Sequence, residues 1–224
     1  MLGLRPKFVS LPLLLVFIGA GVLVPTQPTQ VHAGEVLVPA EWREAHPGPY
    51  TITVAVLVDE EWVARFGADA QKVAYAVLAA AGRHFAPADI DLRPVRYEIW
   101  ESRDGVYPIQ DVLDSLELSH RPNGADIVLG LTAGYVGQEG GAARPRGPYV
   151  VVKHHLYHLE RDAYVLTHEI AHTLGLHHHS CPDGRCIMAD HEYDPDEHWC
   201  DHHLGLLGAN GGLFQYLQGA NLQA

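Results

Sequence analysis

Four segments of the chain have the apolar patterns of β-strands. Residues 50–58 (YTITVAVLV) alternate and are rich in β-branched side chains, as half-buried strands are. Residues 125–131 (ADIVLGL) form a near-continuous apolar run, which is expected of a strand that is covered on both faces of a sheet. Related patterns predict two further strands, at residues 90–100 and 149–153.

Three helices are predicted between and after these strands. Residues 68–85 are rich in alanine, and their apolar positions recur every three or four residues, which is helical spacing. Residues 108–119 and 160–176 are predicted to form the other two helices. The segment at residues 137–147 is rich in Gly, Pro and Arg and is expected to be a loop. The resulting order, β-α-β-α-β-β-α, predicts an α+β fold in which helices pack on a mixed α/β sheet.

The length of the chain suits one folded domain. Its 224 residues, 47% of them hydrophobic, are enough to bury a substantial core. We expect this domain to span residues 49–224. A short lead-in at residues 34–48, with prolines and several charges, precedes it.

The first 33 residues have the pattern of an export signal. Arg5 and Lys7 form a basic start, residues 8–24 form an apolar run, and residues 31–33 (VHA) offer a small-x-small cleavage site. We therefore expect residues 1–33 to be a signal peptide and the rest of the chain to be secreted or extracytoplasmic. The alternative is an uncleaved segment that tethers the protein to a membrane, although the apolar run is short for a spanning helix.

Charge and histidine content narrow the chemistry. The formal net charge is −12, and no patch rich in Lys and Arg is present, which argues against nucleic acid as a partner. Histidine is unusually frequent, with 16 residues. Most of them fall between residues 154 and 203, and such clustering suits metal binding.

Residues 168–178 contain the motif H-E-x-x-H-x-x-G-x-x-H. His168 and His172 are four residues apart, so that on a helix both imidazoles project from one face and can share one ion. Glu169 follows the first ligand and can reach a metal-bound water. Gly175 can adopt the left-handed conformation that ends a helix, which lets His178 turn back to the metal. Three protein ligands and one open position form a catalytic zinc site.

Through these positions the sequence resembles the metzincin metallopeptidases. The resemblance implies a twisted mixed sheet with packed helices, an active-site helix, a methionine turn beneath the metal and a C-terminal helix. Met188 follows the motif and is the expected methionine of this turn, although the same residue can also serve as a gap-filler in a core. His177 and His179 flank His178 and are alternative third ligands.

All three cysteines, Cys181, Cys186 and Cys200, follow the motif. Their spacing resembles the archaemetzincin (archaelysin) branch, which carries a second zinc site with four cysteines. His203 stands where the fourth cysteine is expected, so the resemblance implies a second, structural zinc held by three thiolates and one imidazole. The chain departs from the branch in having two extra residues after the third histidine and a shorter interval before Cys200. The alternative is a disulfide between Cys181 and Cys186, which an oxidising compartment would favour.

These observations predict a zinc-dependent peptidase that acts on peptide or protein substrates. Glu169 would be the general base, and activity should fall below pH ~6 as the histidine ligands become protonated. Two alternatives stay open. One is an aminopeptidase in place of an endopeptidase, and the other is an exported metal-binding protein without catalysis.

The resemblance also assigns roles outside the motif. A free strand edge near residues 140–144 would pair with an extended substrate, although the same residues also suit a flexible Gly-rich loop. Tyr193 could donate to the oxyanion of the transition state. His154, His155 and His158 precede the motif and are expected to be loop histidines.

Overall fold

The computed structural model describes residues 50–102, 105, 107–134, 137–155, 158–178, 185–189 and 198–209. The expected signal peptide at residues 1–33 and the lead-in at residues 34–48 lie outside these ranges and stay predictions. Within the described ranges, no helix has the length and apolar character needed to cross a membrane.

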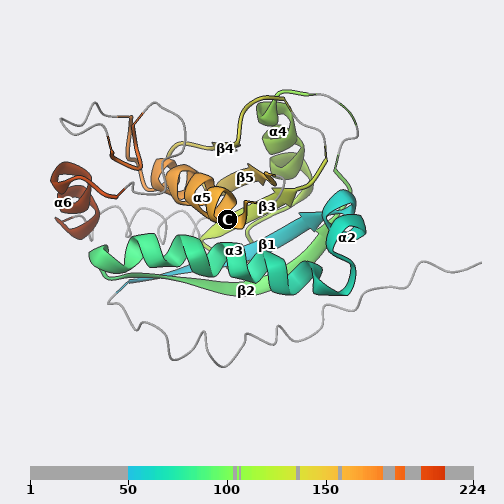
Figure 1. The fold of residues 1–224 in the computed structure, drawn as a ribbon, viewed down its shortest axis with the longest axis horizontal. Coiled ribbons are helices and arrows are strands. Elements are labelled where there is room, and N and C mark those ends of the chain that lie inside the picture. The colour runs from blue at the N-terminus through green and yellow to red at the C-terminus, as the bar shows by residue number, and fades with distance from the viewer. Residues whose placement is uncertain are drawn as a thin grey trace, which may run out of the picture. The chain divides into compact units, whose positions relative to one another are not determined.

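A five-stranded mixed sheet is the centre of the described part of the chain (Figure 1). The strands are β1 (Tyr50–Asp59), β2 (Ile90–Trp100), β3 (Ile127–Thr132), β4 (Gly141–Ala143) and β5 (Tyr149–Lys153). Their order is β2-β1-β3-β5-β4, and all neighbours are parallel except β4 and β5. β4 therefore lies antiparallel to its neighbour at one edge of the sheet.

Helices cover both faces of this sheet. The described helices are α2 (Glu60–Phe66), α3 (Ala70–Phe85), α4 (Ile109–Ser119), α5 (Leu159–Thr173) and α6 (Asp201–Ala209), with short 3-10 turns at Gly67–Asp69 and Ala86–Ala88. Of these, α3 and α5 cover one face of the sheet and α4 covers the other. Alternate residues of β1 point to opposite faces, so Val54 and Val56 pack in the core under α3 and α5, while Ala55 and Leu57 pack against α4. α3 and α5 lie side by side over the first face (Figure 1).

The α+β architecture predicted from the sequence is confirmed, and one helix was missed. The predicted helix at residues 68–85 begins at Ala70, after the separate short helix α2. The Asp59 side chain starts α2 by accepting a hydrogen bond from the backbone N–H of Trp62 at 2.7 Å. Acidic residues in the first turn also favour this helix start. The polar Asp-Glu-Glu run that starts at the last residue of β1 was therefore a capping signal.

The segment at residues 137–147, expected to be a loop, contains the strand β4. Its three residues, Gly-Ala-Ala, have neither the length nor the β-branched side chains of a strand pattern. Their strand geometry comes from pairing with β5, in which Ala142 lies opposite Val151. Of the two readings left open for residues 140–144, the strand edge is the one that the structure contains.

The opposite edge of the sheet, β2, is irregular. The register between β1 and β2 shifts after Val54, which pairs with Pro94, because Ala55 pairs with Arg96. Val95 is thus an extra residue, and the strand bulges there. Proline has no backbone N–H to donate, and within sheets it is found on edge strands and at bulges, as Pro94 is here.

Candidate active site

The helix α5 carries the first two histidines of the motif and ends in time for the third. It ends at Thr173, three residues earlier than predicted, and Gly175 has a φ of 83°. Leu176 N donates to Ala171 O at 3.0 Å, and Gly175 N donates to His172 O at 3.0 Å. This pair of bonds is a Schellman cap, which reverses the chain direction as the glycine predicted.

The cap brings the three motif histidines together. The Nε2 atom of His168 lies 3.1 Å from that of His172 and 3.0 Å from that of His178, and the remaining pair is 3.2 Å apart. Three nitrogens bound to one tetrahedral zinc at 2.0–2.1 Å would lie about 3.4 Å apart. The donor set and its spacing therefore fit one zinc ion.

The other ring nitrogens fix the tautomers of two of these histidines. His168 Nδ1 lies 2.7 Å from the carbonyl oxygen of Ile187, and His172 Nδ1 lies 3.0 Å from that of Leu176. A carbonyl oxygen only accepts, so each Nδ1 carries the hydrogen and each Nε2 carries a lone pair. Two lone pairs that face each other at 3.1 Å require a cation or a proton between them.

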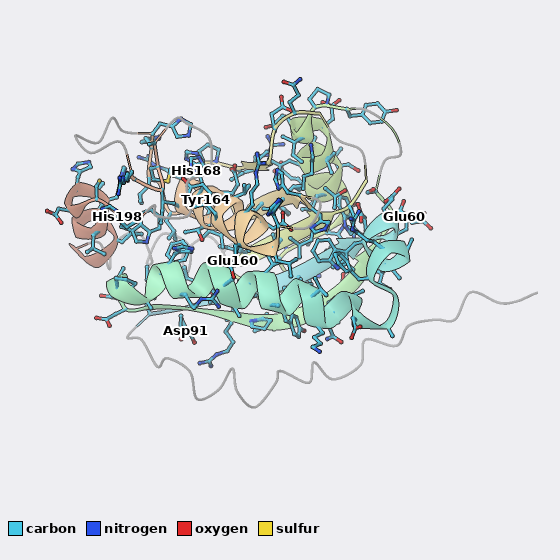
Figure 2. The ribbon with its side chains drawn as sticks, in the orientation of Figure 1. Glu60, Asp91, Glu160, Tyr164, His168 and His198 are labelled. Carbon is cyan, nitrogen blue, oxygen red and sulfur yellow. The ribbon has the colours of Figure 1, made fainter. Side chains whose placement is uncertain are left out.

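The expected methionine turn passes directly beside the first histidine. Met188 is fully buried in the main core and follows Ile187, whose carbonyl also accepts from the Tyr164 hydroxyl at 3.1 Å. Figure 2 shows His168 and Tyr164 toward the end of α5 that is nearer to His198 and α6. Two backbone bonds, from Ile187 N to His198 O and from His198 N to Arg185 O, connect the turn to that segment.

Glu169 is enclosed although it carries an ionisable group. Glu169 belongs to the helix α5, and it is only 8% exposed. Burial raises the pKa of the Glu169 carboxyl to about 8. Burial also lowers the pKa of His172, which keeps this imidazole neutral to lower pH. A cation close to Glu169 would favour its ionised form, which is the form that can accept a proton.

The edge strand β4 approaches Glu169 at a glycine. A Cβ built at Gly141 would lie 2.8 Å from Cγ of Glu169 and 2.7 Å from Cγ1 of Val165. Real Cβ atoms do not come this close to other carbons, so only glycine permits the present distance between β4 and α5. Sequence reasoning placed the edge near this position without identifying the glycine as the reason for the approach.

The turn between β4 and β5 is tied down on two sides. The Arg144 guanidinium forms ion pairs with Glu117 at 2.6 Å and Asp114 at 2.5 Å, both on α4. Arg146 has a φ of 59°, and its backbone N–H donates to the carbonyl oxygen of His172 at 3.1 Å. The hairpin that carries β4 is therefore connected by its backbone to the end of α5 that carries His172.

A second group of side chains that could hold a metal ion contains two of the three cysteines predicted for the second site. The structure brings together Cys186, Cys200 and His203, with His203 Nδ1 at 3.1 Å and 3.3 Å from the two sulfurs. Nε2 of the same ring lies 3.1 Å from the carbonyl oxygen of His177. Nε2 is thus the donor, and Nδ1 presents its lone pair to the sulfurs. Cys181, the predicted fourth member, lies outside the described residues.

The histidines before the motif lie in a loop, as expected, but they differ in burial. They lie in the connection between β5 and α5, but His154 is buried, and its Nδ1 lies 2.5 Å from Asp162 Oδ2. The other carboxylate oxygen accepts from the backbone N–H of His155 at 2.7 Å and lies 3.0 Å from Nδ1 of that ring. Asp162, which the sequence analysis missed, fixes the entry into α5. His158 is the exposed one of these three histidines.

Of the alternative third ligands and the expected oxyanion donor, the structure describes only His177. His177 is exposed, and His178 is the residue whose ring meets those of the other two motif histidines. His179 and Tyr193 lie outside the described residues, so their predicted roles stay predictions.

Comparisons with known proteins place the chain in a family. The family described as metallo-peptidase family M12 matches residues 48–203, which is more than half of the chain. A search of curated protein sequences gave no match. Among solved structures, an archaemetzincin from Methanopyrus kandleri is similar with a TM-score of 0.54 and 24% identity, covering 78% of this chain and 98% of that one.

A second solved structure, described as a chaperone–substrate complex, is similar with a TM-score of 0.57 and 14% identity. The match covers 75% of this chain but only 35% of the other, so this chain spans about a third of that protein. At these sequence identities the similar structures support the fold alone, and the family match supports the enzyme class. The chain belongs to metallo-peptidase family M12, a family of zinc-dependent peptidases, and has a fold similar to that of an archaemetzincin.

Proposed function

We propose that this protein hydrolyses peptide bonds with one zinc ion held by His168, His172 and His178. The observation that carries the proposal is the pair of Nε2 lone pairs on His168 and His172, which face each other at 3.1 Å. Their Nδ1 atoms are committed to backbone carbonyls, so neither ring can rotate its hydrogen into the gap without losing that bond. A zinc ion satisfies all three nitrogens at once.

Glu169 is proposed as the general base. Zinc bound in this site supplies a Lewis acid for the scissile carbonyl and lowers the pKa of water to about 7. Glu169 accepts a proton from the attacking water and passes it to the leaving amine. The enclosed position of Glu169 suits this role, because a carboxylate with few water contacts is a stronger proton acceptor.

The edge strand β4 is proposed to hold the substrate. It lies at the end of the strand order and antiparallel to β5, so its outer backbone groups face away from the sheet. An extended peptide that pairs with this edge by β-augmentation would pass close to Glu169, because Gly141 touches that side chain. Main-chain pairing predicts recognition of extended peptide or protein segments in general.

A second zinc ion is proposed at Cys186, Cys200 and His203, with Cys181 as the fourth ligand. The lone pair of His203 Nδ1 points to both sulfurs, and a closed set of three thiolates and one imidazole is a normal structural zinc site. Such a site would join the turn that carries Met188 to the helix α6. A disulfide between Cys181 and Cys186 is the competing outcome, and the zinc content of the purified protein tests it.

We propose an extracytoplasmic location for the activity. The support is the export pattern of residues 1–33, with a basic start, an apolar run and a small-x-small site. The mature chain is expected to be secreted, or tethered to a membrane if this segment stays uncleaved. N-terminal sequencing of the exported protein tests the cleavage after Ala33.

The test of the function is cleavage of a mixed peptide library by the zinc-loaded chain, beside Glu169→Gln and beside the chain treated with a chelator. Cleavage that both controls lose, and that added zinc restores to the chelated chain, supports the peptidase. A folded, zinc-loaded chain that cleaves nothing would favour a metal-binding protein without catalysis. Matched peptides with blocked and free N-termini separate an endopeptidase from an aminopeptidase.

A further inference from the structure

The second metal group contains one imidazole among its thiols, and an imidazole has a chemical property that a thiolate lacks. A thiolate offers one sulfur to a metal and has no hydrogen left to donate. The ring of His203 has two nitrogens on opposite sides, so one can bind a metal while the other donates a hydrogen bond. His203 is only 1% exposed, so both of its ring nitrogens contact protein groups and are shielded from water.

The two nitrogens of His203 face two different parts of the molecule. Nδ1 lies within 3.3 Å of the sulfurs of Cys186 and Cys200. Nε2 donates to the carbonyl oxygen of His177 at 3.1 Å, which is the peptide group that leads directly into His178. His203 therefore touches both the thiol group and the backbone of the third motif histidine.

The third motif histidine needs such support more than the first two. His168 and His172 lie on the helix α5, and their rings are held by backbone carbonyls at Nδ1. His178 lies beyond the helix end, outside regular secondary structure, and is exposed. Its direction therefore depends on the backbone of the residues just before it, where the His203 bond acts.

We propose that His203 is a positioning residue that couples the thiol site to the catalytic site through the His177 carbonyl. The inference rests on the proposed function, because it assumes that both groups bind zinc. With Nδ1 on a metal, the hydrogen must stay on Nε2, so filling the thiol site fixes the donor that orients His178. Loss of that metal frees the ring and weakens the catalytic site.

The test compares His203→Cys with the wild-type chain. This variant keeps a thiolate for the second site but removes the Nε2 donor, so it separates metal binding from the hydrogen bond. His203→Ala removes both, and His158→Ala is the control, because His158 is an exposed histidine outside both metal groups. Circular dichroism and thermal unfolding establish that each variant is folded.

Zinc affinity is the measurement, so the test does not depend on catalysis. The number of zinc ions per chain is determined. The affinity of the imidazole site for zinc is then measured by titration with a competing chelator. Cobalt substitution identifies each site, because thiolate ligands give charge-transfer absorption that imidazole ligands do not. We expect His203→Cys to keep the thiolate absorption and to bind zinc about two- to tenfold more weakly at the imidazole site, the range expected for one lost hydrogen bond.

The outcomes separate the inference from the function on which it rests. Unchanged zinc affinity at the imidazole site, in either His203→Cys or His203→Ala, would overturn the coupling even if the chain is an active peptidase. A wild-type chain that binds a single zinc and shows no thiolate absorption with cobalt would overturn the second site itself. Weakened affinity in both variants, with His158→Ala unchanged, supports the coupling even if no peptide is cleaved.

Discussion

The carbonyl oxygen of Ile187 lies 2.7 Å from Nδ1 of His168 and sets which nitrogen of that ring faces the metal site. The residue before it, Cys186, belongs to the thiol group, and the residue after it is Met188. One short turn thus touches both proposed zinc sites. The methionine is buried in the core and stabilises the turn by packing. The contact with the histidine ligand comes from the backbone of its neighbour.

Replacement of the proposed base should separate catalysis from metal binding. In Glu169→Gln the side chain keeps its size but cannot accept the proton, so kcat is expected to fall by roughly 10²- to 10⁴-fold. Zinc content should match that of the wild-type chain, because Glu169 is not among the proposed zinc ligands. Peptide cleavage rates and metal analysis of the same samples measure both quantities. Activity near the wild-type value would remove Glu169 from the mechanism.

The buried carboxyl of Glu169 predicts a pH dependence of stability in the chain stripped of metal by a chelator. Its pKa is raised from 4.5 to about 8, so the folded state holds a proton that the unfolded state releases between these values. Stability should be highest below pH 4.5 with respect to this group, and should fall as pH rises toward 8, by on the order of a few kcal/mol.

Urea unfolding of the metal-free chain at pH 5 and pH 8 measures this effect. Glu169→Gln is the control, because its neutral side chain has no such proton to lose, and its stability should change less over the same interval. If the unfolding free energies of the wild-type chain and the variant change equally between pH 5 and pH 8, the pKa of the buried Glu169 carboxyl is not raised in the folded state.

The absence of a side chain at Gly141 should matter for activity. Gly141→Ala places a Cβ within 2.8 Å of carbons of Glu169 and Val165, so the strand or the base must move. A displacement of this size near the reacting groups is expected to lower kcat/KM by about ten- to a hundredfold. Gly205→Ala is the matched control, because a Cβ there meets no atom within 4 Å. Equal activity of the two variants would contradict the close approach.

The ion pairs of Arg144 should affect substrate binding more than stability. Arg144→Ala frees the hairpin from α4, and we expect KM to rise about two- to fivefold, with little change in unfolding free energy because the pairs are exposed to solvent. Arg83→Ala, which breaks a longer and more exposed pair with Glu160, should leave both quantities unchanged. An unchanged KM in Arg144→Ala would show that the hairpin is held without this residue.

The grouping of the three motif histidines was more predictable from sequence than the structure around them. The motif spans few residues and depends on helix geometry, so spacing alone placed His168, His172 and His178 together. Gly175 likewise predicted the end of the helix from the local sequence, because a left-handed φ is favoured by glycine itself and does not depend on distant contacts. The α+β class followed from strands and helices with strong apolar patterns.

Contacts that depend on chain segments far apart in sequence were not predictable in this way. Nothing local to Ile187 indicates that its carbonyl would meet His168, and the approach of Gly141 to Glu169 depends on how β4 and α5 pack. The pairing of His154 and His155 with Asp162 was missed because a charged residue in the first turns of a helix normally suggests solvent exposure. β4 was too short to show a pattern of its own.

The irregular edge at β2 has a consequence for how the molecule meets other chains. Pro94 and the bulge at Val95 leave that side poorly suited to accept a further strand, whereas β4 ends the sheet on the other side without either feature. Among the described strands, recruitment of an extended segment is thus confined to the side next to Glu169. Self-association by strand addition would have to use the outer edge of β4, which is also the proposed substrate-binding edge. A bound substrate would therefore block aggregation by this route, and aggregation would block turnover.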